Sequence, residues 1–262
     1  MSAASLVSGP LQPQARFRRL VSAEFLKLRR RRALLAASLG LIVAPMLVSF
    51  AVLAVLHAAN PGKYGPAGGA ENLRGSLHLL TQIGAVAAVL IGVKAGGGDA
   101  AADVFRELVV TGRSRLALFA ARIPGGLALL LPLAAAAFAI AATASVALAG
   151  SGQTPGAGLL IEYAAWVGLA TSLGFVLALG VSSLLDSQVT SIGVLLAWRF
   201  AVDPLLLQSG KLDPVLLGAA LERIEPGAGR TSISLLTAIV LIVAWTIVPL
   251  AAGAWRTQTR DA

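Results

Sequence analysis

The chain has no cysteine among its 262 residues, so neither a disulfide nor a thiolate metal site is possible. It is also poor in charge. Asp, Glu, Lys and Arg make up 13% of the residues, whereas a soluble domain of this length carries about 25%. Hydrophobic residues make up 57%, and no single soluble core could bury this much apolar surface. The composition therefore predicts an all-α, polytopic membrane protein.

Residues that carry catalytic chemistry are equally scarce. The two histidines, His57 and His78, fall at the outer ends of apolar segments with no acidic or cysteine cluster beside them, so neither is expected to be a metal ligand or a base. The glycine triplet at 96–98 is not followed by Gly-Lys-Ser/Thr and is not a phosphate loop. No serine has a matching histidine and acid in an evident constellation. We predict no catalytic residue, no metal site and no cofactor in this chain.

Six apolar segments are long enough to cross a bilayer. At 1.5 Å per residue, the 24 residues of the first would reach about 36 Å. A basic region precedes this segment, so a cleaved signal peptide is the alternative, but the length of the segment and the spans that follow favour a retained helix. We predict one six-helix transmembrane domain over residues 33–262, with spans at about 33–56, 76–95, 118–149, 161–184, 189–207 and 232–254.

The segments that flank the spans are distinct in composition. Residues 1–13 are small and polar with two prolines, and we expect them to be disordered. Residues 14–32 combine apolar positions at helical spacing with many arginines, which predicts an amphipathic helix among lipid headgroups. A nucleic-acid-binding arm is the weaker alternative, because no aromatic residues interleave with the arginines. A short outer helix is predicted before the last span, with Asp213 as N-cap and Pro214 at its first position.

The distribution of Lys and Arg predicts the orientation. With the N-terminus inside, 13 of the 21 basic residues lie in inner segments and five in outer loops, and the other three lie within spans. We therefore place the chain in the cell membrane with both termini in the cytoplasm.

A charged segment between the second and third spans, residues 96–115, differs from everything around it. Read as a helix, it has a charged face and an apolar face, and the glycines at 96–98 and 112 would bound it. It predicts a surface helix suited to docking a soluble partner, and a solvated loop without a partner is the alternative. The charged face holds Asp99, Asp103, Arg106 and Glu107, and the apolar face holds Val104, Phe105, Leu108 and Val109.

Two charges lie at bilayer depth in the fifth predicted span. Arg199 is about ten residues into it, roughly 15 Å deep, and Asp203 follows four residues later on the same helical face. The pair either lines a polar cavity that a substrate crosses or forms a local ion pair that orients the helix, and the second interpretation is slightly favoured. Near the start of the third span, Arg122 is expected to snorkel to the interface. The four tryptophans are expected to be interface anchors or lipid contacts: Trp166, Trp198, Trp245 and Trp255.

Two short motifs resemble those of the permeases of type-2 ATP-binding-cassette (ABC) exporters. The segment 22–29, Ser-Ala-Glu-Phe-Leu-Lys-Leu-Arg, resembles the "(A)E-aromatic-L-K-L-R" sequence that leads into the first span of these permeases. The segment 105–115, Phe-Arg-Glu-Leu-Val-Val-Thr-Gly-Arg-Ser-Arg, lies where the family has its coupling helix and resembles its "T-x-R-S/R" ending. Asp99 stands where many members have glutamate. The six spans and the outer helix are similar too.

The resemblance implies a half-transporter. Two copies of the permease would work with two ATPase subunits, which would bind ATP and Mg²⁺. The substrate would be hydrophobic or amphipathic, such as a drug, a lipid or a modified peptide. The alternative is a membrane assembly or immunity protein that binds a peptide or lipid without pumping it. Nucleic acid is not an expected partner. The resemblance places the ATPase contact on Asp99, Asp103, Phe105, Arg106, Glu107, Arg113 and Arg115.

Overall fold

The computed structural model describes residues 13–98, 114–185, 187–227 and 233–259, and in these ranges it is built from helices without a strand. Six helical segments in these ranges are long and apolar enough to cross a membrane, so the prediction of an all-α, multi-pass membrane protein is confirmed. They are Arg32–Ala59 (α2, Arg32–Ile42, and α3, Ala44–Ala59), Ala70–Gly97 (α4), Arg115–Ala147 (α6), Ala157–Leu184 (α7), Gln188–Leu207 and Leu235–Thr259 (α11). The fifth segment contains α8 (Gln188–Ala197), η1 (Trp198–Val202) and α9 (Asp203–Leu207).

Two kinds of sequence feature set these boundaries. Most helices extend beyond the predicted apolar runs, because polar first and last turns at Ala70 and Thr259 continue the same helix. The first span is interrupted instead: α2 and α3 meet at Val43, just before Pro45. A proline has no N–H to donate to the preceding turn, which accounts for the break.

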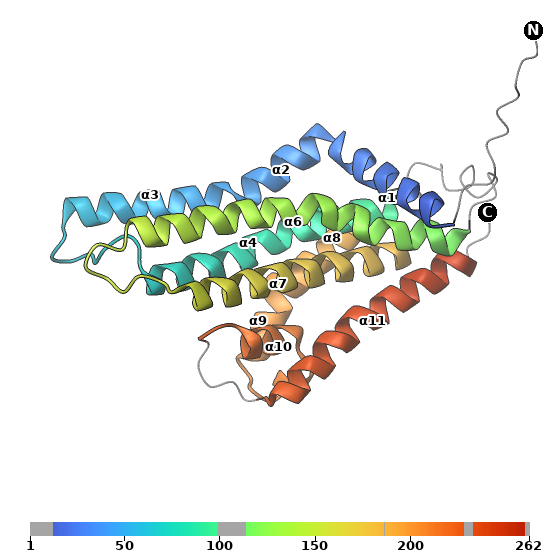
Figure 1. The fold of residues 1–262 in the computed structure, drawn as a ribbon. Helices are drawn as coiled ribbons and strands as arrows, with labels where there is room; N and C mark the ends of the chain where they lie inside the picture. The colour runs from blue at the N-terminus through green and yellow to red at the C-terminus, as the bar shows by residue number, and fades with distance from the viewer. Residues whose placement is uncertain (1–12, 99–113, 186, 228–232, 260–262) are drawn as a thin grey trace, which may run out of the picture.

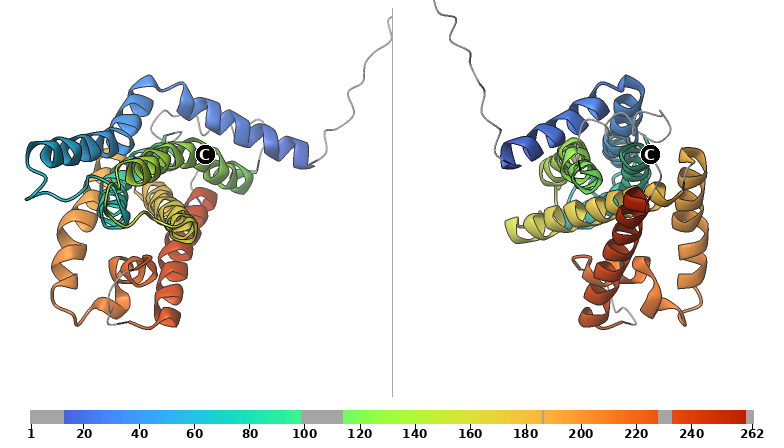
Figure 2. Two further views of the ribbon diagram at one scale, coloured as in Figure 1. Left: turned by 60° about the vertical axis from the view of Figure 1, so that its left-hand side comes forward. Right: turned by 90° about the vertical axis from the view of Figure 1, so that its right-hand side faces the viewer.

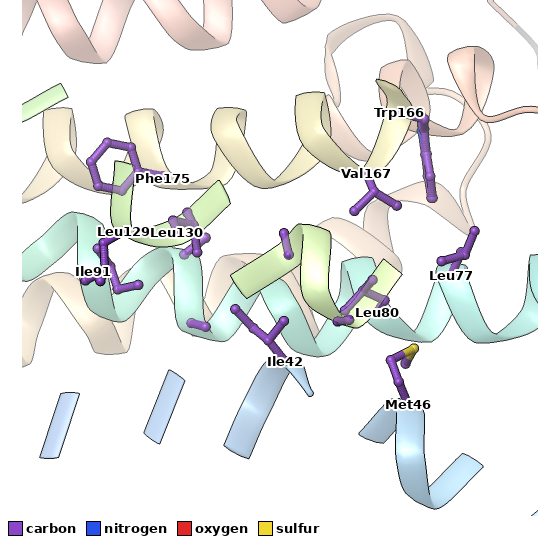
Figure 3. Close-up of a cluster of buried hydrophobic side chains, with 14 of the residues drawn as sticks. Ile42, Met46, Leu77, Leu80, Ile91, Leu129, Leu130, Trp166, Val167 and Phe175 are labelled. Carbon is purple, nitrogen blue, oxygen red and sulfur yellow. The ribbon is translucent and has the colours of Figure 1, made fainter. Parts of the chain in front are cut away.

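The pair α4 and α7 forms the centre of the bundle (Figure 1). Half or more of the most apolar stretch of each helix is buried, compared with 6% for α11, which runs obliquely along one side. Helices α2, α3 and α6 pack on the pair from other directions. The core close-up in Figure 3 shows side chains from these elements meeting there: Ile42, Met46, Leu77, Leu80, Ile91, Leu130 and Phe175.

Small residues let α4 and α7 approach closely. A Cβ atom at Gly92 would lie 2.6 Å from the Phe175 carbonyl oxygen and 2.7 Å from the Cβ atom of Ala178. One turn later, a Cβ at Gly96 would collide with the hydroxyl of Ser182. Small residues at every fourth position allow close helix packing in many membrane proteins. The glycine triplet predicts a helix break that begins at Gly96, whereas α4 continues through Gly96 and Gly97 and is capped at Gly98.

The predicted amphipathic helix at 14–32 is observed as α1 (Pro13–Arg29). It packs across the start of α6, where a Cβ at Gly125 would lie 2.7 Å from the Cβ atom of Glu24. Leu28 is fully buried in this contact region, while Phe17 and Leu26 stay exposed. Helix α1 and the last turn of α11 lie at the same end of the bundle, as Figure 1 shows. We call this the α1 end; its position in the cytoplasm stays a prediction.

Polar side chains bind the last carbonyls of α4 at the α1 end. The prediction that Arg122 snorkels to the interface is wrong: the residue is 3% exposed, and its Nη1 donates to the Gly96 carbonyl at 2.9 Å. Gln188 donates to the Gly97 carbonyl at 3.3 Å and accepts from Lys94 at 2.8 Å. The final carbonyls of a helix have no partner within it, so these side chains supply one from α6 and α8.

Replacing Arg122 with Met should therefore lower stability by about 1–3 kcal/mol, because the substitution keeps the volume but leaves a buried carbonyl without its donor. Thermal unfolding of the purified protein in detergent measures the effect. Arg18→Met, an exposed change on α1, is the control. Equal melting temperatures for the two variants would contradict the assigned role of Arg122.

Candidate functional site

A cavity of about 180 Å³ lies between α4, α7, the fifth span and α10 (Leu217–Ile224). Figure 2 shows α8, α10 and α11 standing to one side of α4 and α7, and the cavity is on this side of the bundle. Its lining is mostly apolar but includes ionisable side chains from three separate segments. The ionisable and tryptophan side chains that line it are His78, Trp166, Trp198, Arg199, Asp203, Glu222 and Glu225.

The two intramembrane charges predicted from the sequence both line this cavity. Arg199 Nη1 lies 3.4 Å from Asp203 Oδ2, which is longer than the 2.7–2.9 Å typical of a charge-assisted hydrogen bond. The Asp203 side chain is 3% exposed. Among the described residues, its second oxygen, Oδ1, has no hydrogen-bond partner. The ion pair is therefore weakly bonded, and one buried oxygen of the Asp203 carboxylate is left without a hydrogen bond.

The backbone around these two residues is not a regular α-helix. Residues Trp198–Val202 form a single turn of π-helix, in which the Asp203 N–H bonds to the Trp198 carbonyl. Pro204 follows directly; it cannot donate, and its ring would clash with the carbonyl four residues back. The wider turn relieves that clash, and π turns inside helices occur frequently at functional sites.

The outer connection between the fifth and sixth spans closes one side of the cavity. It was predicted as a helix starting after Asp213, but Asp213–Val215 forms only a 3₁₀ turn and the α-helix α10 starts at Leu217. The reason is the extended backbone of Leu216, at φ −92° and ψ 134°, which ends the first turn. Next to it, Gly218 faces Asp203, and a Cβ at Gly218 would collide with the carboxylate.

His78 has an acidic neighbour, contrary to the sequence analysis. Its Nδ1 lies 3.6 Å from the Glu225 carboxylate at the end of α10. The two residues are 147 positions apart in the chain, so nothing local in the sequence indicated the contact. The pair ties α4 to α10 and places an imidazole and a carboxylate at the cavity wall.

Further hydrogen bonds bind the connection to α7. The hydroxyl of Tyr163, which is fully buried, donates to the Pro226 carbonyl at 2.8 Å and accepts from Arg74 at 3.2 Å. Gly227 follows with φ of 66°, a left-handed conformation that glycine adopts without strain. Because Arg74 packs against this glycine, a Cβ there would collide with the guanidinium group.

Three of the four tryptophans pack in the same region. The prediction of an interface or lipid contact is wrong for Trp166, which is 6% exposed; Trp198 and Trp245 are half-buried, and for them it stays a prediction. Trp166 donates to the Leu221 carbonyl at 3.3 Å, and Trp245 donates to the Val215 carbonyl at 3.0 Å. The rings of Trp198 and Trp245 lie 5.5 Å apart. Trp166 and Trp198 line the cavity, whereas Trp255 is 65% exposed, as expected of a lipid or interface contact.

Glu222 is the most accessible acid of the site. It lines the cavity and is exposed, so it marks the open side. Partial burial raises the pKa of its carboxyl, and the nearby Glu225 carboxylate raises that pKa further. Glu222 therefore holds its proton to a higher pH than a fully solvated glutamate.

The predicted ATPase-docking residues lie almost entirely outside the described ranges. Asp99, Asp103, Phe105, Arg106, Glu107 and Arg113 all fall within residues 99–113. Arg115 is described: its Nη1 donates to the Gln258 carbonyl at 3.0 Å, which connects the start of α6 to the end of α11.

Sequence reasoning found Arg199 and Asp203 but missed the other residues of the cavity. His78, Trp166 and the pair Glu222 and Glu225 come from three different segments, and only the tertiary packing brings them together. Within the described residues, no cluster of three or more His, Cys, Asp or Glu side chains could hold a metal ion. Neither a protein-family model nor a curated protein sequence matches this chain.

Proposed function

We propose that this protein is the membrane permease subunit of an ABC exporter and that its cavity binds the substrate within the membrane. The main support is Asp203, whose buried Oδ1 has no hydrogen-bond partner among the described residues. This carboxylate lines a cavity, and the described chain has six helical segments apolar enough to cross a membrane. Ionisable groups at membrane depth are costly, and they usually face a polar path or a bound ligand.

The geometry favours a binding site over a purely structural ion pair. A structural pair gains most from short, preferably bidentate, contacts that satisfy both partners. Arg199 and Asp203 instead make one long contact of 3.4 Å, inside a π-helical turn. The apolar walls and the two tryptophans suit a substrate with an apolar body, in line with the amphipathic class that the resemblance implies.

Energy would come from a separate subunit. The sequence has no phosphate loop, so ATP and Mg²⁺ belong to an ATPase that acts in trans, with two copies of each subunit in the working unit. The amphipathic pattern of residues 99–110 suits the contact with that ATPase.

Helix α4 supplies a direct mechanical connection between the two sites. It lines the cavity from His78 to Val89 and ends at Gly97, two residues before Asp99, the first charged residue of the charged segment. Its 28 residues span about 42 Å as one helix. Because α4 and α7 interlock through Gly92 and Gly96, a push on the charged segment would move both helices and change the shape of the cavity.

The test is purification of the tagged protein from its native membrane, followed by an ATPase assay. We expect a cassette ATPase to accompany the permease, and its hydrolysis rate to rise when an amphipathic substrate is added. If the permease is pure and intact but no ATPase accompanies it, the assembly or immunity function becomes the better account.

Reversing the charges of Asp103, Arg106 and Glu107 together should release the ATPase and abolish ATP-driven transport, because charge-assisted hydrogen bonds across the contact would become repulsions. Copurification and transport both measure the effect. The control reverses Lys63 and Glu71, which are exposed at the opposite end of the bundle, and it should leave both intact. Normal assembly of the triple variant would show that the docking residues are assigned wrongly.

A further inference from the structure

We propose that the cavity binds a small organic cation, a positively charged nitrogen attached to an apolar body about the size of one ring. The proposal deepens the function proposed above by naming the substrate class. Binding itself needs no ATPase, so it can be tested separately from transport.

The charges of the cavity do not balance. Arg199 faces Asp203, and His78 faces Glu225. Glu222 has no ion-pair partner in the part of the chain that the structure describes. The lining residues therefore hold three carboxylates against one guanidinium and one imidazole, and the acids are in excess even when His78 is protonated. A bound monovalent cation would offset this excess, completely when His78 is protonated and partly when it is neutral.

Asp203 gives that cation a specific contact. Its Oδ2 faces Arg199, and the Gly218 backbone N–H also interacts with the carboxylate. Oδ1 is buried and has no hydrogen-bond partner among the described residues. A buried acceptor left unsatisfied destabilises the protein, and more so when it is charged. An ammonium group that binds Oδ1 would remove this destabilisation.

The walls of the cavity favour an organic cation over a metal ion. Hard metal ions take about six or more oxygen ligands, whereas most of the lining here is carbon, from residues such as Leu177, Leu195 and Leu221. Trp166 and Trp198 both line the cavity. The faces of indole rings attract organic cations electrostatically.

The volume limits the size of the ligand. The cavity holds about 180 Å³, slightly more than a cavity of about 150 Å³ that accommodates benzene. One ring with a short ammonium arm fits inside it, whereas a longer chain would have to extend out through the open side at Glu222.

The first experiment measures binding of benzylammonium to the permease alone in nanodiscs, by tryptophan fluorescence. This probe has N–H groups that can donate to Asp203 Oδ1, and as an alkylammonium it keeps its charge between about pH 5 and 8. We expect saturable quenching by the cation and at least roughly tenfold weaker binding of two comparators, neutral N,N-dimethylbenzamide and anionic phenylacetate. Trp166→Phe should remove a large part of the signal. Equal affinity for the neutral comparator would overturn the proposal.

The second experiment identifies the carboxylates. Glu222→Gln and Asp203→Asn should each weaken cation binding roughly tenfold, whereas Glu162→Gln, an exposed change on α7 outside the cavity, should have no effect. Unchanged affinity in both cavity variants would overturn the proposal. If Asp203→Asn fails to fold, Glu222→Gln and the three-ligand comparison still decide the question.

The pH dependence has a defined sign. As pH rises, Glu222 loses its proton through its raised pKa and His78 becomes neutral, so the cavity becomes more negative and binds the cation more tightly. The other charged groups around Glu222 are Asp203, Arg199, Glu225 and Asp213. Binding that weakens between about pH 5 and 8 would contradict the proposal.

The two proposals can fail separately. If the protein binds the cation but no ATPase accompanies it, the proposed ligand class is supported and the proposed transport function is contradicted. If neutral or anionic compounds stimulate ATP hydrolysis but the cation never does, the proposed transport function is supported and the proposed ligand class is contradicted.

Discussion

Replacing Arg199 with Ala is expected to destabilise the protein by about 3–5 kcal/mol, because the change leaves the Asp203 carboxylate buried without its cation. The Asp203 side chain is 3% exposed, and the guanidinium group of Arg199 is the only cation that forms an ion pair with it in the described part of the chain. Protein yield from membranes and the unfolding temperature in detergent measure the loss.

The double variant Arg199→Ala with Asp203→Asn separates the two interpretations of the pair. Removing both charges leaves no unpaired ion, so most of the lost stability should return. If the pair only orients the helix, transport should return too. We expect transport to stay below about a tenth of its normal rate, because the cavity has lost the carboxylate that contacts the substrate. Normal transport by the double variant would assign the pair a structural role alone.

Gly92→Leu is expected to have a comparable effect on stability, at about 3 kcal/mol or more. A Cβ at Gly92 would lie 2.6 Å from the Phe175 carbonyl oxygen, and a backbone atom in the middle of α7 cannot move away as a flexible side chain can. The two central helices would have to separate along their whole contact. Loss of folded protein after detergent extraction is the expected result.

A matched substitution tests whether the contact, rather than the loss of glycine, causes this effect. Gly168 lies on α7, and a Cβ there would have no atom within 4 Å. Gly168→Leu should therefore give normal yield and an unchanged unfolding temperature. If both variants are equally unstable, close packing between α4 and α7 is not the reason that a larger residue at position 92 destabilises the protein.

The sequence predicted the features that depend on local patterns. Apolar runs predicted six spans, and the described part of the chain contains six helical segments long and apolar enough to cross a membrane. Helical spacing of the apolar residues predicted the helix α1, and the i, i+4 spacing of Arg199 and Asp203 predicted that they could pair. Each of these signals depends on residues only a few positions apart.

The features that the sequence analysis missed depend on contacts between distant segments. His78 and Glu225, or Tyr163 and Pro226, meet only because α10 folds back onto α4 and α7. Arg122 lies near the end of an apolar run, which suggested snorkelling, but the unpaired carbonyl of Gly96 offers it a buried partner. Gly92 and Gly96 did have a local signal, the small residue at every fourth position, and the glycine triplet was instead interpreted only as a break.

The central claim is that ATP hydrolysis on a partner changes the cavity in which substrate binds, and thiol labelling tests it directly. Because the chain has no cysteine, Ala170→Cys at the cavity wall would be the only thiol, and Ala136→Cys on the exposed face of α6 would be the control. We predict that a polar thiol reagent labels the cavity cysteine, that ATP added with the ATPase changes the labelling rate severalfold, and that labelling blocks transport. A cavity cysteine that labels at the same rate with and without ATP, or whose labelling leaves transport unchanged, would contradict the account.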